Sequence, residues 1–211
     1  MVRVWMSFVA VAVLFASAQV QAQTVIPFDG ATQSSYYPNP GWSGPAANLI
    51  DDNPATQWQS HGCSDNEGKD YTPSVTFFFD DIYNVGGVSI RNLFGGAAER
   101  GARDVDILVS LDGVKFDYYT SIVVLKDTAA DKDSCMVQDF EFLGGVDAMA
   151  VMFEFKSNHW NWAFYPGHHE GTWANASIVG LVDVQFTQTV PEPAAMSLLV
   201  LGGLAMLRRK R

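Results

Sequence analysis

The first stretch whose side chains suggest chemistry is an oxygen-rich turn near residue 50. The run Asp-Asp-Asn-Pro at positions 51–54 predicts a tight turn, because Asx side chains bond their own backbone and Pro pre-sets φ. The Asp51 carboxylate, the carbonyls around Asn53 and the Thr56 hydroxyl gather hard oxygens, which are the ligands that calcium prefers. An Asx turn that closes the loop without an ion is the alternative interpretation.

The second candidate is an aromatic stretch at residues 157–175. Flat aromatic faces beside hydrogen-bonding side chains suit a sugar, because the apolar face of a pyranose stacks while its hydroxyls are bonded. The aromatic residues are Trp160, Trp162, Phe164, Tyr165 and Trp173, and the polar ones include Asn158, His159, His168, His169 and Glu170.

Two other interpretations of this stretch remain open. The tryptophans could instead cap the end of a core. His168, His169 and Glu170 could bind a transition metal, although three consecutive residues rarely point at one ion. For a sugar site we favour Trp160, Trp162, Tyr165, His159, His168 and Asn158 as the contact residues.

Catalytic motifs are not found in the sequence. It contains no G-x-S-x-G elbow, no H-E-x-x-H and no Gly-rich phosphate loop. The adjacent carboxylates at 51–52 and 80–81 lie in turn contexts, where neighbours diverge rather than face each other across a bond. The sequence therefore predicts a binding protein rather than an enzyme.

Charge argues against nucleic acid as a partner. The formal net charge is −10, from 13 basic and 23 acidic residues. The segments 1–22 and 190–211 hold five of the basic residues and one of the acidic ones, which leaves 8 against 22, or −14, between them. A body this acidic repels phosphate backbones.

Both ends of the chain look like processing segments. Residues 1–22 combine Arg3, an apolar run over 4–16 and the small-residue site Val-Gln-Ala, which predicts a secretory signal peptide cut by signal peptidase before Gln23. With export predicted, the two cysteines, Cys63 and Cys135, are expected to form one disulfide; two free thiols are the alternative.

The body of the chain predicts an all-β fold. No segment keeps a 3.6-residue apolar period for three turns, whereas several alternate with period two. Short apolar runs bounded by turn residues and without helices between them imply an antiparallel sandwich or barrel. The expected strands are 75–79, 87–92, 105–110, 118–125, 136–142, 148–155 and 178–186.

The C-terminal segment 190–211 joins Pro-Glu-Pro, fourteen uncharged residues and a basic end, Arg-Arg-Lys-Arg. It resembles a PEP-CTERM sorting tail. The resemblance implies transient membrane association, cleavage by exosortase, and a Gram-negative cell surface or extracellular matrix as the destination. A permanent membrane anchor is the alternative.

Three motifs resemble the discoidin family, also called coagulation-factor type C domains, which are related to galactose-binding modules. They are Ala31-Thr-Gln-Ser-Ser, the stretch from Ala47 to Trp58, and Val105-Asp-Ile-Leu-Val-Ser-Leu-Asp-Gly. The resemblance implies a jelly-roll β-sandwich of about eight antiparallel strands over residues 23–189.

The family's calcium ligands transfer to Asn48, Asp51, Asn53, Thr56 and Gly180 by this resemblance. Leu181 stands where the family has a ligating Glu, and Asp52 replaces a Gly. The only cofactor that these residues suggest is a structural calcium ion. For function we predict an exported module that binds extracellular polysaccharide, with a structural or adhesive surface protein as the alternative.

Overall fold

Antiparallel strands dominate the part of the chain that the computed structural model describes, which is residues 24–37, 43–61, 70–160 and 177–189. These residues belong to one unit, Thr24–Thr189. None of its helices is long and apolar enough to cross a membrane, so far as the structure describes the chain. The elements are β1 Thr24–Val25, β2 Phe28–Gln33, the 3-10 helix η1 Ala46–Leu49, β3 Trp58–Gln59, β4 Ser74–Asn92, the 3-10 helix η2 Gly95–Arg100, β5 Asp104–Ser110, β6 Asp117–Val123, β7 Val137–Phe155 and β8 Gly180–Gln188.

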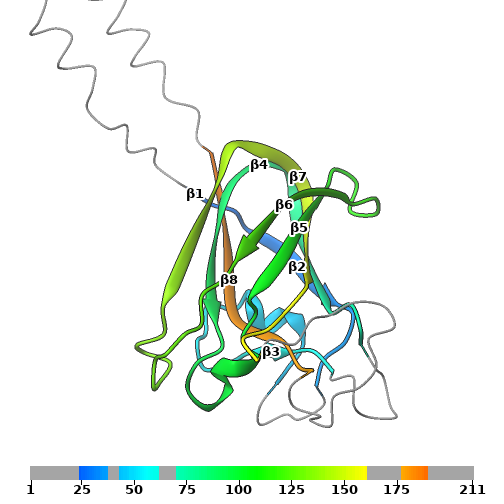
Figure 1. The fold of residues 1–211 in the computed structure, drawn as a ribbon. Helices are drawn as coiled ribbons and strands as arrows, with labels where there is room; N and C mark the ends of the chain where they lie inside the picture. The colour runs from blue at the N-terminus through cyan, green and yellow to red at the C-terminus, as the bar shows by residue number, and fades with distance from the viewer. Residues whose placement is uncertain (1–23, 38–42, 62–69, 161–176, 190–211) are drawn as a thin grey trace, which may run out of the picture. The chain divides into compact units, whose positions relative to one another are not determined.

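The strands form two layers that share the long strands β4 and β7 (Figure 1). One layer joins β2, the first part of β4, the last part of β7, β5 and β6. The other joins β1, β8, the second part of β4 and the first part of β7, and β3 also pairs with β8. All these pairings are antiparallel, so the predicted all-β class with about eight strands is confirmed.

The boundaries predicted inside β4 and β7 were wrong. Segments 75–79 and 87–92 are one strand, and so are 136–142 and 148–155. Their register shifts where turns were expected, between Phe78 and Tyr83 and between Val85 and Gly87. Gly144 and Gly145 have φ values of +83° and +69°, which suits glycine. The turn-forming residues therefore produce bulges that carry a strand from one layer into the other.

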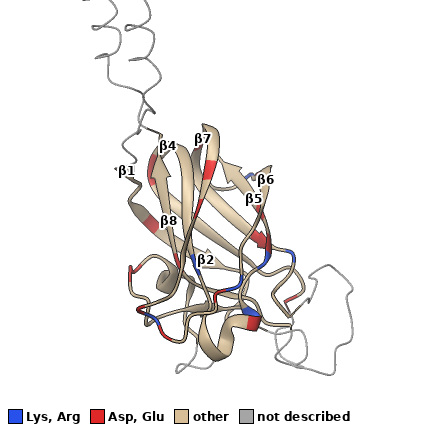
Figure 2. Cartoon of the chain, turned by 60° about the vertical axis from the view of Figure 1, so that its left-hand side comes forward, with Lys and Arg blue, Asp and Glu red and all other residues tan. Residues whose placement is uncertain are grey.

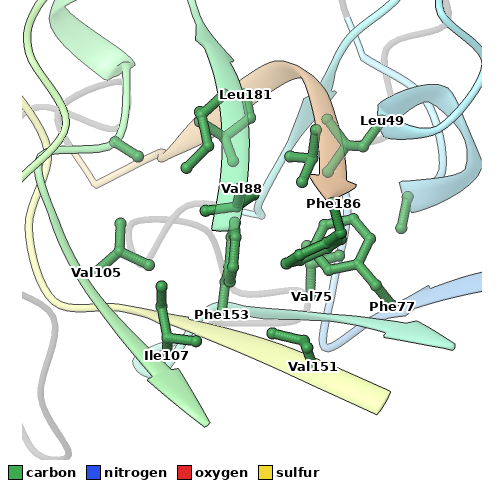
Figure 3. Close-up of a cluster of buried hydrophobic side chains, with 14 of the residues drawn as sticks. Leu49, Val75, Phe77, Val88, Val105, Ile107, Val151, Phe153, Leu181 and Phe186 are labelled. Carbon is green, nitrogen blue, oxygen red and sulfur yellow. The ribbon is translucent and has the colours of Figure 1, made fainter. Parts of the chain in front are cut away.

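The core fills the space between the layers with side chains that alternate along each strand (Figure 3). Phe77, Phe153 and Phe186 are fully buried and meet edge to face at centroid distances of 5.2 to 5.9 Å. Burying a side chain of this size stabilises the fold by about 2–3 kcal/mol. The period-two pattern in the sequence is thus the pattern of the core.

Trp58 closes this core at the end where the candidate sites lie. It is fully buried and stacks on Phe155 at a centroid distance of 5.3 Å. Its indole N–H donates to the Ser35 carbonyl over 2.9 Å. Because Trp58 follows the Asp51 turn and Phe155 precedes Asn158, one ring contact supports both candidate regions.

Candidate functional site

The Asp51 turn is closed by short-range hydrogen bonds. The Asn53 N–H donates to Asp51 Oδ1 over 3.0 Å, and the Ala55 N–H donates to Asn53 Oδ1 over 3.1 Å. These are Asx turns, in which a side chain replaces a backbone acceptor. Asp52 has φ +51° and is the only residue other than glycine with a positive φ among those the structure describes. Asp thus occupies the left-handed position that the family gives to Gly, which Asp tolerates better than most residues.

The Thr56 hydroxyl lies at the centre of four oxygen atoms. Thr56 Oγ1 is 2.9 and 3.0 Å from the two carboxylate oxygens of Asp51, 2.8 Å from the Asn53 carbonyl and 3.4 Å from that of Asn48. The structure therefore brings together four of the five predicted metal residues. One hydroxyl proton cannot satisfy four acceptors at once, so the cluster suits a cation in its chemistry.

The fifth predicted ligand, Gly180, lies on β8 and is buried. Its carbonyl accepts the Ala102 N–H over 3.2 Å. A Cβ atom at this position would approach the Trp58 carbonyl to 2.4 Å, so the close packing of β8 on β3 requires glycine. Leu181 is buried opposite Trp58 and provides no ligand, as expected from its side chain.

Asp183 provides the carboxylate that β8 directs toward this region. Burial raises the pKa of Asp183, the Arg91 guanidinium at 3.7 Å opposes that rise, and the negative charges of Asp52 and Asp51 add to it. The part of the chain that the structure describes contains no group of three or more His, Cys, Asp or Glu side chains able to hold a metal. The oxygen cluster around Thr56 instead combines a single carboxylate with carbonyls and a hydroxyl.

Asn158 fixes the start of the aromatic stretch. Its side chain is fully buried, its Nδ2 donates to the Ile178 carbonyl over 2.8 Å, and its Oδ1 accepts the Trp160 N–H over 3.1 Å. A backbone bridge also joins it to Ala102. Both ends of the amide are therefore engaged, and Asn158 positions its neighbours.

His159 is held as a neutral ring. The His159 backbone N–H donates to the Gly101 carbonyl over 3.1 Å, and the ring Nε2 is buried without a hydrogen-bond partner. Burial lowers the pKa of His159, and the charges of Arg103 and Lys126 lower it further, while a bond to the Val124 carbonyl and the charge of Glu99 oppose the shift. At neutral pH the ring is therefore uncharged, which suits its buried position.

Trp160 is exposed. Its fractional exposure is 45%, which is unusual for so large an apolar side chain. It is not part of the buried core, so the interpretation of this tryptophan as a core cap is not supported. Trp162, Tyr165 and His168 lie outside the described residues, as do the possible metal ligands His169 and Glu170, and their roles remain predictions.

Sequence reasoning missed a polar junction at the same end. Asp70 is mostly buried, and its carboxylate accepts the hydroxyls of Ser34 and Ser35 over 2.5 Å each. The Ser35 hydroxyl in turn accepts the His61 N–H over 3.0 Å. The sequence shows the serine pair directly before a turn-rich stretch, but no local pattern links these serines to Asp70, 35 positions or more away.

The predicted disulfide is not shown. Cys135 is a free, partly buried thiol, and burial raises its pKa. Cys63 lies outside the described residues. A thiol with a raised pKa is mostly protonated at neutral pH and therefore a weak nucleophile.

A two-layer antiparallel sandwich with these strand pairings defines a galactose-binding-like domain. The family model described as F5/8 type C domain matches residues 30–166, and the chain belongs to this family. The model described as PEP-CTERM protein-sorting motif matches residues 189–211. This motif indicates a secreted protein that exosortase processes.

Solved structures with the same fold share little sequence with the chain. The F5/8 type C domain of a Bacteroides fragilis protein is 14% identical with a TM-score of 0.57, covering 80% of this chain and 98% of that one. CpGH89CBM32-5 from Clostridium perfringens, in complex with GalNAc-beta-1,3-galactose, is 18% identical with a TM-score of 0.56, covering 77% and 99%.

A truncated AlyQ with CBM32 and alginate lyase domains is 13% identical with a TM-score of 0.55. The match covers 82% of this chain and 35% of AlyQ, so the chain spans about a third of that protein. No match is found among curated proteins. At these identities the likeness shows the fold alone, and the site has to be argued from the residues of this chain.

Proposed function

We propose that the domain is a non-catalytic carbohydrate-binding module, and that the rim at Asn158, His159 and Trp160 is its binding site. The exposed indole of Trp160 is the observation that carries the proposal. When the apolar face of a sugar covers an exposed indole, water leaves both surfaces, and this stabilises the complex.

The neighbours of Trp160 support this role. The buried Asn158 side chain holds the Trp160 backbone, so that little conformational entropy is lost when a ligand binds. The His159 ring, adjacent in sequence, has its Nε2 buried, so it supports the Trp160 segment rather than contacting the sugar. Trp162, Tyr165 and His168 would extend the platform. The solved relative that holds GalNAc-beta-1,3-galactose supports a glycan as the ligand class.

For location, we propose an exported protein at the surface or in the extracellular matrix of a Gram-negative bacterium. Residues 1–22 would be removed by signal peptidase and residues 190–211 by exosortase, which leaves the domain at 23–189. The partner would be an extracellular polysaccharide, with membrane association only until the C-terminal segment is cut.

Calcium belongs to the same proposal as a structural ion rather than a catalytic one. Asn48, Asp51, Asn53 and Thr56 fit a hard cation through their oxygens. Its role there would be to replace the Thr56 hydroxyl proton as the group that joins these acceptors. The β8 side of the site is the weaker half, since Leu181 has no oxygen in its side chain.

The test is glycan-array screening followed by calorimetry on the mature domain, with and without a chelator. Trp160→Ala should abolish the binding of any glycan that the wild type binds, while the unfolding midpoint stays unchanged. Val114→Ala, at an exposed position in the β5–β6 hairpin, is the matched control and should bind normally. Binding that survives Trp160→Ala would place the site elsewhere and contradict the proposal.

A structural or adhesive protein is the second candidate, and one observation favours it. Large apolar side chains are exposed at the other end of the sandwich, including Leu143 at 92% and Val114 at 84%. Exposed apolar residues of this size support contacts between proteins. Under this alternative no glycan binds, and Leu143→Ser lowers adhesion to the matrix whereas Trp160→Ala does not.

A further inference from the structure

We propose that the glycan bound at the Trp160 rim is anionic and carries carboxylates, as a polymer of uronic acids does. This inference rests on the proposed function, because it names the class of sugar that the same rim would bind. The supporting observation is that basic residues lie in the segments bonded to Ser157 and His159, although the protein as a whole has a net charge of −10.

The backbone ties these basic residues to the rim. The Arg103 N–H donates to the Ser157 carbonyl over 3.0 Å, and the Val124 N–H, two residues before Lys126, donates to the Arg103 carbonyl over 2.8 Å. Gly101, which follows Arg100, accepts the His159 N–H. Arg100, Arg103 and Lys126 therefore lie in segments that are directly bonded to the start of the aromatic stretch.

Two acidic residues of this region, Glu99 and Asp104, already pair with these cations. Glu99 lies 2.5 Å from the Lys126 ammonium, and Asp104 lies 3.4 Å from Arg103 Nε and also accepts the Ser157 hydroxyl. The side chains of Arg103 and Lys126 remain 41% and 39% exposed. An exposed ion pair contributes at most about 1 kcal/mol, so a ligand carboxylate can join or replace it at little cost.

The balance of charge at His159 agrees with this arrangement. Arg103 and Lys126 act on its ring as two positive charges, and Glu99 acts as one negative charge. Residues 99–104 and 122–126 together hold three basic side chains, Arg100, Arg103 and Lys126, against two acidic ones, Glu99 and Asp104. The local balance is therefore one positive charge, opposite in sign to that of the whole chain.

The opposite end of the sandwich shows the contrast (Figure 2). Asp80, Asp81, Asp112 and Asp147 lie there, and none of them forms an ion pair within the described ranges. β5 separates the two ends by seven residues, or about 20 Å, which is about two Debye lengths in 0.1 M salt. Screening therefore removes most of the repulsion from those acids, and the nearby cations decide the interaction.

The chemistry favours carboxylate over other anions. A guanidinium donates two parallel hydrogen bonds to a planar carboxylate, and this fork geometry adds direction as well as charge. Trp160 follows His159, on which both charges act. One uronate unit could therefore stack its ring on the indole and direct its carboxylate toward Arg103 or Lys126.

The experiment compares the mature domain binding to oligogalacturonate, to the same oligomer with its carboxyl groups reduced to alcohols, and to dextran sulfate. We expect the uronate form to bind at least about tenfold more tightly than the reduced form, and its affinity to fall as NaCl rises from about 0.05 to 0.5 M. Arg103→Gln and Lys126→Gln should each weaken uronate binding about three- to fivefold and change binding of the reduced form less than about twofold.

Lys115→Gln is the matched control, because it removes the same charge from the β5–β6 hairpin at the opposite end. It should leave uronate binding within about twofold of wild type. Equal binding of the reduced oligomer, or an equal effect of Lys115→Gln and Lys126→Gln, would overturn the inference and leave the proposed function intact. Dextran sulfate binding as tightly as uronate would overturn the carboxylate assignment. No binding of any saccharide would overturn the proposed function as well.

Discussion

The Asp51 turn and the Asn158–Trp160 segment lie at the same end of the sandwich but are built in opposite ways. The hydrogen bonds that shape the Asp51 turn join residues at most nine positions apart. The Asn158–Trp160 segment depends on partners far along the chain, with Asn158 bonded to Ile178 and His159 to Gly101. The conformation of the turn depends on its own residues, whereas that of the segment depends on contacts that form only when the domain has folded.

This difference predicts how each region responds to damage. A local turn can reform on its own, and its polar groups stay close to water, so that a lost hydrogen bond costs little. A segment held by buried long-range bonds loses its shape when one partner is removed, because the remaining buried group cannot find another partner. Long-range bonds make the Asn158–Trp160 segment rigid, which suits a binding surface. Short-range bonds are enough to gather the oxygen atoms of the Asp51 turn.

Removing Trp58 should have the largest effect, because its ring supports both regions. We expect Trp58→Ala to lower the free energy of unfolding by about 3–5 kcal/mol, since it deletes a fully buried ring stacked on Phe155. Denaturant unfolding followed by tryptophan fluorescence measures the change. Trp58→Phe keeps most of the volume and should cost clearly less. Equal losses in the two variants would show that the indole N–H bond to Ser35, rather than the packing, stabilises this end.

Asn158→Ala should have the next largest effect and should separate the two regions. It leaves the buried Ile178 carbonyl and the Trp160 N–H without their partner, at a cost of about 2 kcal/mol, and it should also abolish glycan binding. Asn53→Ala is the matched change in the exposed turn and should cost about 1 kcal/mol or less. Calorimetry and thermal unfolding of both variants make the comparison. A larger loss for Asn53→Ala would contradict the assignment of local and long-range stabilisation.

Thr56→Val tests the oxygen cluster at nearly constant volume. In a chelator the variant loses the bonds from the hydroxyl to Asp51 and Asn53, and we expect a loss of about 1 kcal/mol. If the wild type binds calcium, adding the ion should raise its melting temperature and raise that of the variant less. The same shift in both proteins would exclude Thr56 as a ligand, and no shift in either would favour the ion-free Asx turn.

The pH dependence of His159 should give the smallest effect. Its pKa is lowered in the folded state, so between that pKa and about 6.5 the unfolded chain binds the extra proton. The free energy of unfolding should therefore fall as pH falls through this window, and His159→Gln should make the profile flatter there. Thermal unfolding between pH 7.5 and 5 measures it, and the profile above pH 7 serves as the internal control. Parallel profiles for the two proteins would rule out His159 as the titrating group.

The sequence predicted the parts of the fold that depend on local pattern. Alternation marked β5, β6 and β8 to within about two residues, and the Asx and Pro chemistry of 51–54 marked the turn. The very short strands β1 and β3 escaped notice because two residues show no period. Asp80–Asp81 and Gly144–Gly145 suggested turns but lie in bulges. The same residue types form turns and bulges, and a bulge results when a neighbouring strand continues the pairing.

The candidate site was predictable by residue type but not by geometry. The aromatic stretch drew attention to Trp160, whereas the buried role of Asn158 depends on Ile178, twenty positions away. The contribution of Arg103 and Lys126 was not visible either, since a single positive charge in an acidic sequence carries no periodic signal. Only the pairing of β5 with β6 and β7 brings those charges to the rim.

The pairing of β1 with β8 decides how the domain can be held. Thr24 lies opposite Gln188, and the Thr189 N–H is bonded to Asn84, so the first and last residues of the sandwich leave it side by side. β8 runs nine residues from Gly180 to this point, a length of about 30 Å. A segment that continues from Thr189 is therefore attached to the domain at the end far from Trp160. Under the proposed function, the rim at Trp160 would therefore lie at the end opposite the point of attachment.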